Sequence, residues 1–109
     1  MNILYIHQHF STPKGSVGTR SYEMASSLIA RGHNVTIVCG SYKGGVTGID
    51  KPFLKGKRIG KIREIRVIEL DLSYSNNDNF IKRSITFIKF ALHSIVIVFK
   101  ENYDVLFAT

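Results

Sequence analysis

NILYIHQHFSTPKGSVGTRSYEMASSLIARGHNVTIVCG, residues 2–40, is the stretch that decides the fold. It opens with a short unbroken apolar run, Ile3–Ile6, which is typical of a strand buried on both faces. A polar loop containing Gly15 and Gly18 follows this run. Apolar residues then recur at helical spacing, which predicts a helix over residues 19–31.

The end of this stretch completes a strand–helix–strand unit. Gly32 is the expected left-handed residue that terminates the helix, and Val35–Val38 is expected to form a second buried strand. Such a unit places two parallel strands under one helix with a right-handed crossover. The loop after the first strand and the start of the helix then face the crevice in which α/β folds bind their ligands.

Two more strands are expected further along the chain. Residues 40–60 are rich in glycine and are predicted to be a loop. A third strand is predicted at Ile65–Leu72 and a fourth at Tyr103–Thr109. The fold class is therefore α/β, a three-layer Rossmann-like parallel sheet that stops after its fourth strand. The polar connection after the third strand offers helix N-cap candidates in Asn76, Asn77 and Asp78.

A long helix is predicted over residues 80–100, FIKRSITFIKFALHSIVIVFK, which is apolar almost all round. Its length approaches the roughly 20 residues that span a bilayer, but basic residues interrupt it, and a lysine at a bilayer centre costs about 3 kcal/mol. Two interpretations stay open. One side packs on the sheet and the rest meets another part of the protein, or the helix also lies in a membrane interface. In the second, the residues that meet anionic headgroups are Lys82, Arg83 and Lys89.

Length and composition indicate one small domain in a reducing compartment. The chain has 109 residues, is 44% hydrophobic and carries a formal charge of +7. Its start lacks the basic region of a signal peptide, and no amino-terminal targeting segment is visible. Cys39 is the single cysteine, so no internal disulfide is required and a cytoplasmic location fits. This cysteine is expected to be a small buried hydrophobe.

The positive charge is concentrated between Lys43 and Arg66, where 8 basic and 2 acidic residues give 8 − 2 = +6. Such a segment attracts nucleic acid, acidic lipid headgroups or phosphorylated ligands. Aromatic residues for base stacking are scarce there, which disfavours single-stranded nucleic acid. A solvated loop with solubilising lysines and an anionic-ligand or membrane role remain as the two interpretations.

Familiar catalytic motifs are missing. The spacing Gly15-Ser16-Val17-Gly18 satisfies neither the dinucleotide fingerprint nor the P-loop, which argues against a nicotinamide dehydrogenase and a P-loop NTPase. No paired-carboxylate signature or nucleophile elbow is present. His7 and His9 stand at the end of the first strand, where ligand contact or plain packing are the alternatives and a metal site lacks a third ligand. His33, in the turn after the helix, is expected to be structural.

Three pieces of the opening stretch occur in a recognisable order. They are YIHQHF at 5–10, a loop with Pro13, Gly15 and Gly18 before Arg20, and LIARGHNV at 28–35. This order resembles the start of bacterial family-4 glycosyltransferases. The likeness is greatest to enzymes of O-antigen and capsule assembly, including the fucosamine-transferase-like members. It covers nearly the whole chain and is strongest over residues 2–40.

The resemblance implies a fold, an activity and a site. The family has two facing Rossmann-like domains (the GT-B fold). Residues 1–109 would be part of the amino-terminal, acceptor-side domain, and the donor-binding domain would be absent. The family moves a sugar from a nucleotide-sugar, its substrate, to a lipid-diphosphate-linked acceptor, with retention and without a metal or other cofactor. Carried onto this sequence, the loop implies a substrate-binding set of His9, Gly15, Ser16, Gly18 and Arg20.

The same resemblance also implies what is missing. The family's donor site contains two glutamates separated by seven residues, and no pair of glutamates here has that spacing. No catalytic residue is therefore assigned, and the chain alone is expected to be inactive. Expected partners are a nucleotide-sugar, a polyprenyl-diphosphate-linked acceptor, an anionic membrane surface at the inner face of the plasma membrane, and a carboxyl-terminal domain or partner chain; nucleic acid is not expected.

Two alternatives belong to other classes: a non-catalytic membrane-docking or scaffold module, and a flavodoxin-like or receiver-like binding domain. The chain could also be the acceptor-binding half of a split transferase. A receiver-like domain would need clustered acids at the strand ends, and Asp71 and Asp104 do not form that pattern. For Arg20, surface pairing with Glu23 or Glu64 is the alternative to ligand contact.

Overall fold

The computed structural model describes residues 1–8, 10–13, 19–42, 47–49, 52–74 and 79–108. It shows an α/β fold in which two helices accompany a five-stranded, mostly parallel sheet. In chain order the elements are β1 (Asn2–Ile6), α1 (Arg20–Ala30), β2 (Asn34–Tyr42), β3 (Lys57–Ile62), β4 (Ile65–Tyr74), α2 (Phe80–Lys100) and β5 (Val105–Ala108).

The strands lie side by side in the order β3-β4-β2-β1-β5. β1 pairs in parallel with β2 and with β5, and β2 pairs in parallel with β4. β3 is antiparallel to β4. The predicted α/β class is confirmed, but the prediction of an all-parallel, four-stranded sheet is wrong because β3 adds an antiparallel edge.

The error lies in residues 40–60, which the sequence predicted to be a loop. β2 continues to Tyr42, and β3 begins at Lys57. One glycine and three basic residues conceal β3, whose sequence is KRIGKI. Its strand conformation comes from pairing with β4, in the register Arg58↔Glu69 and Gly60↔Val67, and this non-local contact overrides weak local propensity.

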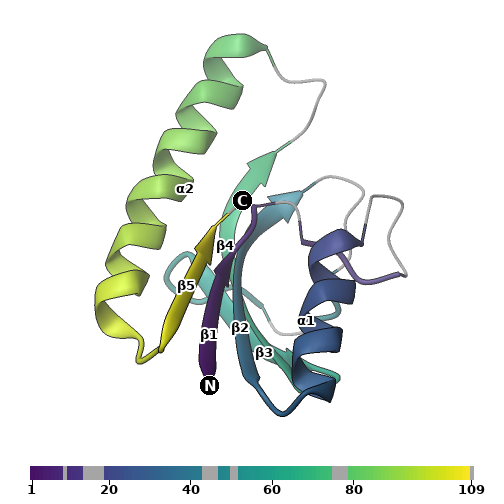
Figure 1. Cartoon of the computed structure of the whole chain (residues 1–109). Coiled ribbons are helices and arrows are strands. Elements are labelled where there is room, and N and C mark those ends of the chain that lie inside the picture. Colours follow the sequence, from purple (N-terminus) through teal and green to yellow (C-terminus); the bar gives the residue numbers. More distant parts are fainter. Residues whose placement is uncertain (9, 14–18, 43–46, 50–51, 75–78, 109) are drawn as a thin grey trace.

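The sheet has one helix on each face, so the predicted three layers are present (Figure 1). Alternate residues of each parallel strand point to opposite faces. On the α1 face, Tyr5, Ile37 and Val67 join Ala25 of α1 in one buried cluster. On the other face, the buried partners of α2 are Leu4, Val38, Ile68 and Leu70.

A single residue marks the C-terminal end of α1, and another marks the N-terminal end of α2. Gly32 has φ +92, the left-handed conformation predicted for the residue that stops α1. The bounds predicted for the long helix, residues 80–100, are confirmed by α2. Its N-cap is Asn79, whose side chain accepts a 2.8 Å hydrogen bond from the Lys82 backbone N–H. The prediction that Asn76, Asn77 or Asp78 caps the helix is wrong, because the cap belongs to the residue directly before the first turn.

Candidate functional site

The segment that follows β1 stays beside β2 at the carboxyl edge of the parallel strands. The His7 backbone N–H donates to the Val38 carbonyl oxygen at 2.9 Å, and the Gly40 N–H donates to the Gln8 carbonyl oxygen at 3.1 Å. This edge is where open α/β sheets place their ligands.

Because Gly40 has no side chain, β2 can pack closely against the Leu72 carbonyl group and the Gln8 side chain. A Cβ added to it would lie 3.2 Å from the Leu72 carbonyl oxygen and 3.5 Å from Gln8 Cγ. The pairing of β2 with β4 also shifts register between Cys39 and Ser41. Such irregularities bend a strand and redirect side chains next to functional sites.

Beyond Gln8 the chain turns inward. Phe10 and Ser11 are fully buried, and the Phe10 ring lies 6.4 Å from the Tyr22 ring of α1. Gln8 is itself 7% exposed, and its Nε2 has no hydrogen-bond partner among the described residues. A buried amide donor without a partner is costly, which makes this nitrogen a candidate to meet a ligand oxygen.

The start of α1 is the second part of the site. Thr19 occupies the N-cap position but makes no side-chain cap hydrogen bond. The first-turn N–H groups of a helix need an acceptor, and an anion can supply it. Arg20, the first helical residue, is exposed beside these groups. The sequence suggested Glu23 or Glu64 as a partner for Arg20. Glu64 forms its ion pair with Lys61 instead, at 3.2 Å.

The other four members of the predicted binding set are His9, Gly15, Ser16 and Gly18. They lie outside the described residues, so their predicted roles stay predictions. A pocket of about 450 Å³ opens beside Thr12 and Pro13, and no sequence pattern indicated it. Its lining comes from the segment after β1, the first turn of α1, the β2–β3 connection, the end of β3 and the β3–β4 turn, and consists of Thr12, Pro13, Tyr22, Gly48, Ile62 and Arg63.

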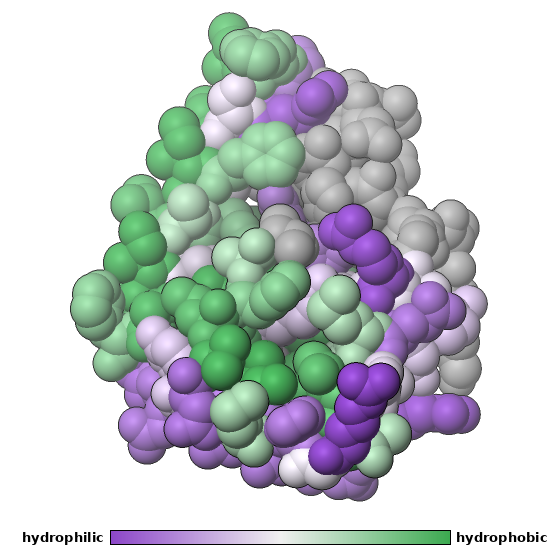
Figure 2. Space-filling model, viewed as in Figure 1, coloured by the Kyte–Doolittle hydropathy of each residue, from purple (hydrophilic) through white to green (hydrophobic). Residues whose placement is uncertain are grey.

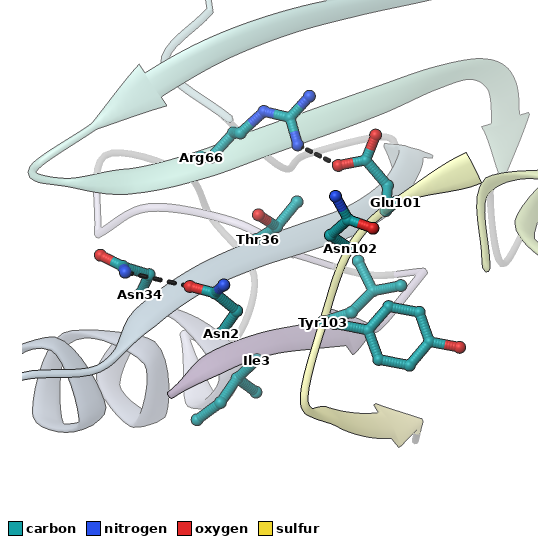
Figure 3. Close-up of a pocket in the computed structure, with 9 residues that line it drawn as sticks. Asn2, Ile3, Asn34, Thr36, Arg66, Glu101, Asn102 and Tyr103 are labelled. Atoms are coloured by element: carbon teal, nitrogen blue, oxygen red, sulfur yellow. Dashed lines mark hydrogen bonds and ion pairs between the residues drawn. The ribbon is translucent and has the colours of Figure 1, made fainter. Parts of the chain in front are cut away.

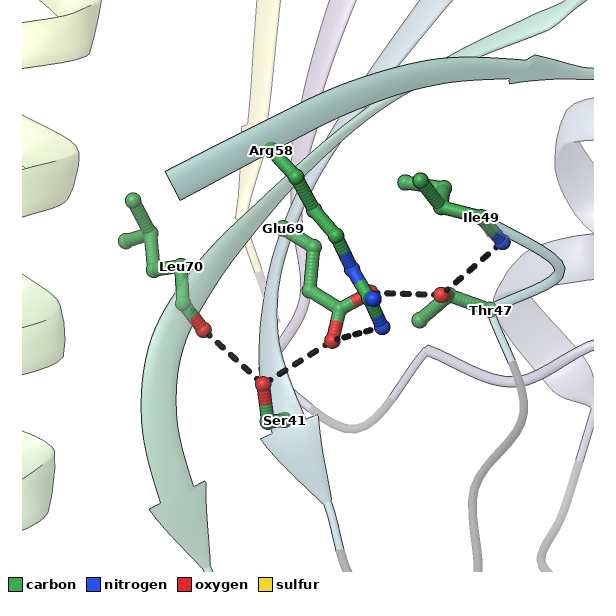
Figure 4. Close-up of polar contacts among 6 residues, drawn as sticks. All are labelled: Ser41, Thr47, Ile49, Arg58, Glu69 and Leu70. Atoms are coloured by element: carbon green, nitrogen blue, oxygen red, sulfur yellow. Dashed lines mark hydrogen bonds and ion pairs between the residues drawn. The ribbon is translucent and has the colours of Figure 1, made fainter. Parts of the chain in front are cut away.

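A buried polar cluster on the same face attaches the β2–β3 connection to the sheet (Figure 4). The Glu69 carboxylate on β4 is 3% exposed and receives two hydrogen bonds from Arg58, at 3.0 and 3.1 Å. Thr47 Oγ1 donates to it at 2.5 Å, and Ser41 Oγ lies 2.9 Å from its second oxygen. The cluster satisfies its own charges and hydrogen bonds, so its role is structural.

Cys39 is fully buried next to this cluster, as predicted. Burial raises the pKa of the Cys39 thiol well above its ordinary value, and the Glu69 carboxylate raises this pKa further, whereas Arg58 lowers it. The thiol therefore remains protonated and behaves as a small apolar side chain.

A small polar pocket lies at the opposite, amino-terminal edge of the strands (Figure 3). Its volume is about 210 Å³, and it is lined in part by Asn2, Asn34 and Arg66, the last of which forms an ion pair with Glu101. Contacts between residues far apart in sequence close this edge. The Asn2 N–H donates to Asp104 Oδ2 at 2.8 Å, and the Asp104 N–H donates to the Asn2 carbonyl oxygen at 2.7 Å.

His33 is found at this same edge, away from the β1 loop. Its Nδ1 lies 3.3 Å from the amino terminus of Met1. This position agrees with the structural role expected for it.

The outward face of α2 is apolar and exposed. Six large residues recur along it at alternating intervals of four and three, which places them on one side of the helix. Figure 2 shows apolar residues gathered over the α2 side of the molecule. With exposed fractions from 48% to 84%, the six are Ile81, Ile85, Ile88, Leu92, Ile95 and Phe99.

Basic residues follow one flank of this apolar face. Lys82, Lys89 and Lys100 are exposed, and their spacing places them along the same flank as the exposed His93. Arg83 is different. It shares the sheet-facing side with the buried Phe90, is only half-exposed, and has a buried Nε. The structure thus separates Arg83 from Lys82 and Lys89, with which the sequence grouped it.

Neither α1 nor α2, the helices of the described ranges, combines the length and hydropathy needed to cross a bilayer. Likewise, no three His, Cys, Asp or Glu side chains in those ranges are grouped so that they could hold a metal ion. Comparison with known proteins found no match to a protein family, to a curated protein or to a solved structure.

Proposed function

We propose that this chain is the acceptor-side part of a glycosyltransferase, which moves a sugar from a nucleotide-sugar to a lipid-diphosphate-linked acceptor at a membrane. One observation carries the proposal. In order along the chain the parallel strands are β1, β2, β4 and β5, and they lie in the sheet in the order third, second, first, fourth. This is the beginning of the Rossmann order, whose switch point lies beside the first strand.

The chemistry beside that switch point suits a diphosphate. The α1 N-terminus presents N–H groups that Thr19 does not cap, Arg20 adds a positive charge, and Gln8 Nε2 is a further donor. His9, Gly15, Ser16 and Gly18 belong to the same loop in the sequence. They complete the proposed binding set through the resemblance described above.

The surface of α2 suits the location of such an acceptor. A polyprenyl chain stays in the bilayer, so the enzyme has to work at the membrane face. An exposed apolar face flanked by lysines is the pattern of helices that lie in the interface of anionic membranes. In this proposal Lys82 and Lys89 meet headgroups while Ile88 and Leu92 enter the acyl boundary. Arg83 supports the helix from its inner side.

Farnesyl diphosphate provides a soluble probe of the acceptor site. We expect saturable binding by NMR titration, with shifts at the His7 and Arg20 amides and little response to farnesol, which lacks the diphosphate. Arg20→Ala should weaken binding about fivefold, since it removes one charge-assisted contact. Arg31→Ala is the matched control, because Arg31 is also exposed but lies at the other end of α1. No saturable binding, or equal losses from both variants, would contradict the proposal.

A non-catalytic membrane-docking module is the second candidate, and the α2 surface favours it. Vesicles of anionic and of neutral phospholipid test the membrane contact that the two functions share. Both candidates predict binding to anionic vesicles that weakens in the Lys82→Glu/Lys89→Glu variant. Lys55→Glu/Lys57→Glu changes the charge equally at two exposed lysines of the basic 43–66 segment; it is the comparison variant and should weaken binding less. Vesicle binding without any affinity for farnesyl diphosphate would favour the docking module.

A further inference from the structure

The inner strands carry polar side chains on the α2 face, beyond the part of that face that α2 covers. β1, β2 and β4 each have a strand on both sides, and inner strands of parallel sheets are usually apolar throughout. Where α2 covers them they do carry apolar residues, such as Leu4 and Ile68, which cluster with Ile97 of the helix. Toward the amino-terminal edge, the residues on the same face are Asn2, Asn34, Thr36 and Arg66.

The strand register brings these four side chains together. Asn2 lies opposite Asn34, and one step along the same face Thr36 lies opposite Arg66. Asn34 Nδ2 donates a 3.0 Å hydrogen bond to Asn2 Oδ1, and Arg66 forms its ion pair with Glu101. Figure 3 shows these two pairs on either side of Thr36.

The end of α2 leaves a hollow above these residues. The helix stops at Lys100, and the backbone of Glu101 is extended, with φ −92 and ψ 148. The hollow, here named the amino-edge pocket, has a volume of about 210 Å³. Its lining consists of the four polar strand residues, Ile3, Leu4 and the α2–β5 connection at 101–103. Inner strands and that connection therefore form the pocket entirely within the described chain.

The charges around the amino-edge pocket are balanced. Arg66 is paired with Glu101, and in an adjoining hollow of about 460 Å³ Lys61 is paired with Glu64. A phosphate or an ammonium group would meet both signs of charge at once, so the lining favours a neutral ligand. The two hollows share Thr36 and Arg66, so the amino-edge pocket is open on that side.

The lining offers both donors and acceptors of hydrogen bonds. A guanidinium has five N–H donors, so the ion pair with Glu101 occupies only some of those of Arg66. The bond between the two asparagine side chains uses one group of each amide and leaves the other groups for a ligand. Each hydroxyl of a ligand can donate and accept, so a molecule with several adjacent hydroxyls matches this lining.

We propose that the amino-edge pocket binds a neutral sugar, as a single ring whose adjacent hydroxyls bond to Arg66, Glu101 and the two asparagines. The pocket is smaller than the roughly 300–1,000 Å³ of sites for drug-sized ligands, which limits the ligand to a small molecule or to one end of a larger one. Ile3 and Leu4 provide apolar contact for the C–H groups of the ring. The pocket lies at the opposite edge of the sheet from the proposed diphosphate site, and its proposed role does not depend on that site.

NMR titration of the 109-residue chain with glucose, galactose and N-acetylglucosamine tests the proposal. We expect at least one of these sugars to cause saturable shifts at the Asn34, Thr36 and Arg66 amides and none at Arg20, which lies at the other edge. Glycerol is the ligand control. It has hydroxyls but no ring to hold them in place, so it should not saturate the pocket.

A pair of threonine variants locates the binding. Thr36→Val keeps the shape of the side chain but removes its hydroxyl, and it should weaken sugar binding about fivefold. Thr86→Val is the matched control, because it removes a hydroxyl of α2 that bonds within the helix, to the Lys82 carbonyl oxygen. Circular dichroism confirms that both variants are folded. Absence of saturable shifts with all three sugars, equal weakening by both variants, or binding of inorganic phosphate or glycine in place of the sugars would overturn the proposal.

Discussion

Glu69 places a buried carboxylate on the sheet, and the hydrogen-bond donors around it allow that charge to be buried. Its oxygens receive donors from β3 and from the β2–β3 connection, so one side chain holds together segments that are distant in sequence. The sequence did not indicate this cluster, because Glu69 meets Arg58 only through the β3–β4 register. Nothing in the local pattern around either residue specifies that register.

Replacing Glu69 should therefore affect stability. Glu69→Gln removes the charge but keeps the shape, leaving the Arg58 guanidinium without its counter-ion. We expect the free energy of unfolding to fall by about 2–4 kcal/mol, measured by urea denaturation.

Glu64→Gln is the control for this measurement. Glu64 and its partner Lys61 have side chains that are 72% and 64% exposed, so solvent screens their ion pair. The expected change is within about 0.5 kcal/mol. Comparable losses from the two variants would show that burial of the Glu69 pair contributes nothing extra.

α2 shows which elements a sequence specifies well. Its bounds were predicted because no glycine or proline interrupts residues 80–100 and because its apolar pattern is long. Its capping residue was predicted wrongly, since several polar residues precede it and the choice among them depends on backbone geometry. β3 lies at the other extreme, because a charged edge strand acquires its structure from its neighbour.

The N-cap of α2 can be tested directly. Asn79→Ala removes the acceptor of the Lys82 N–H, so the free energy of unfolding should fall by about 1 kcal/mol. Asn102→Ala, in an exposed position after the helix, serves as the control and should change stability much less. If the two substitutions had the same effect in thermal or urea unfolding, the cap would not stabilise α2.

On the scale of the whole molecule, charge and hydropathy are separated in space. The outward face of α2 and β5 are apolar, while β3 and the chain around it are basic. The sequence indicated the apolar helix and the basic segment, but it could not place the helix over one face of the sheet and the basic strand at an edge. That placement depends on the strand order β3-β4-β2-β1-β5, which arises from pairing between distant residues.

The lysine flank and the apolar face of α2 together predict how membrane binding should respond to salt. Affinity for anionic vesicles should fall at least tenfold between about 0.05 M and about 0.5 M salt, because exposed charges are screened over that range. Binding to neutral vesicles, driven by the apolar face of α2, should be weaker at low salt and nearly independent of salt. A cosedimentation assay measures both. Salt-independent binding to anionic vesicles would show that the lysine flank takes no part.

The hydrogen bonds between Asn2 and Asp104 have a consequence for synthesis of the protein. They connect residues 102 positions apart, and β1 obtains its outer neighbour only from β5. The first strand to leave the ribosome must therefore wait for this neighbour until residues 105–108 have been synthesised. Long-range pairing of this kind is slow to form. The interval between translation and closure is when a chaperone would be most useful to this protein.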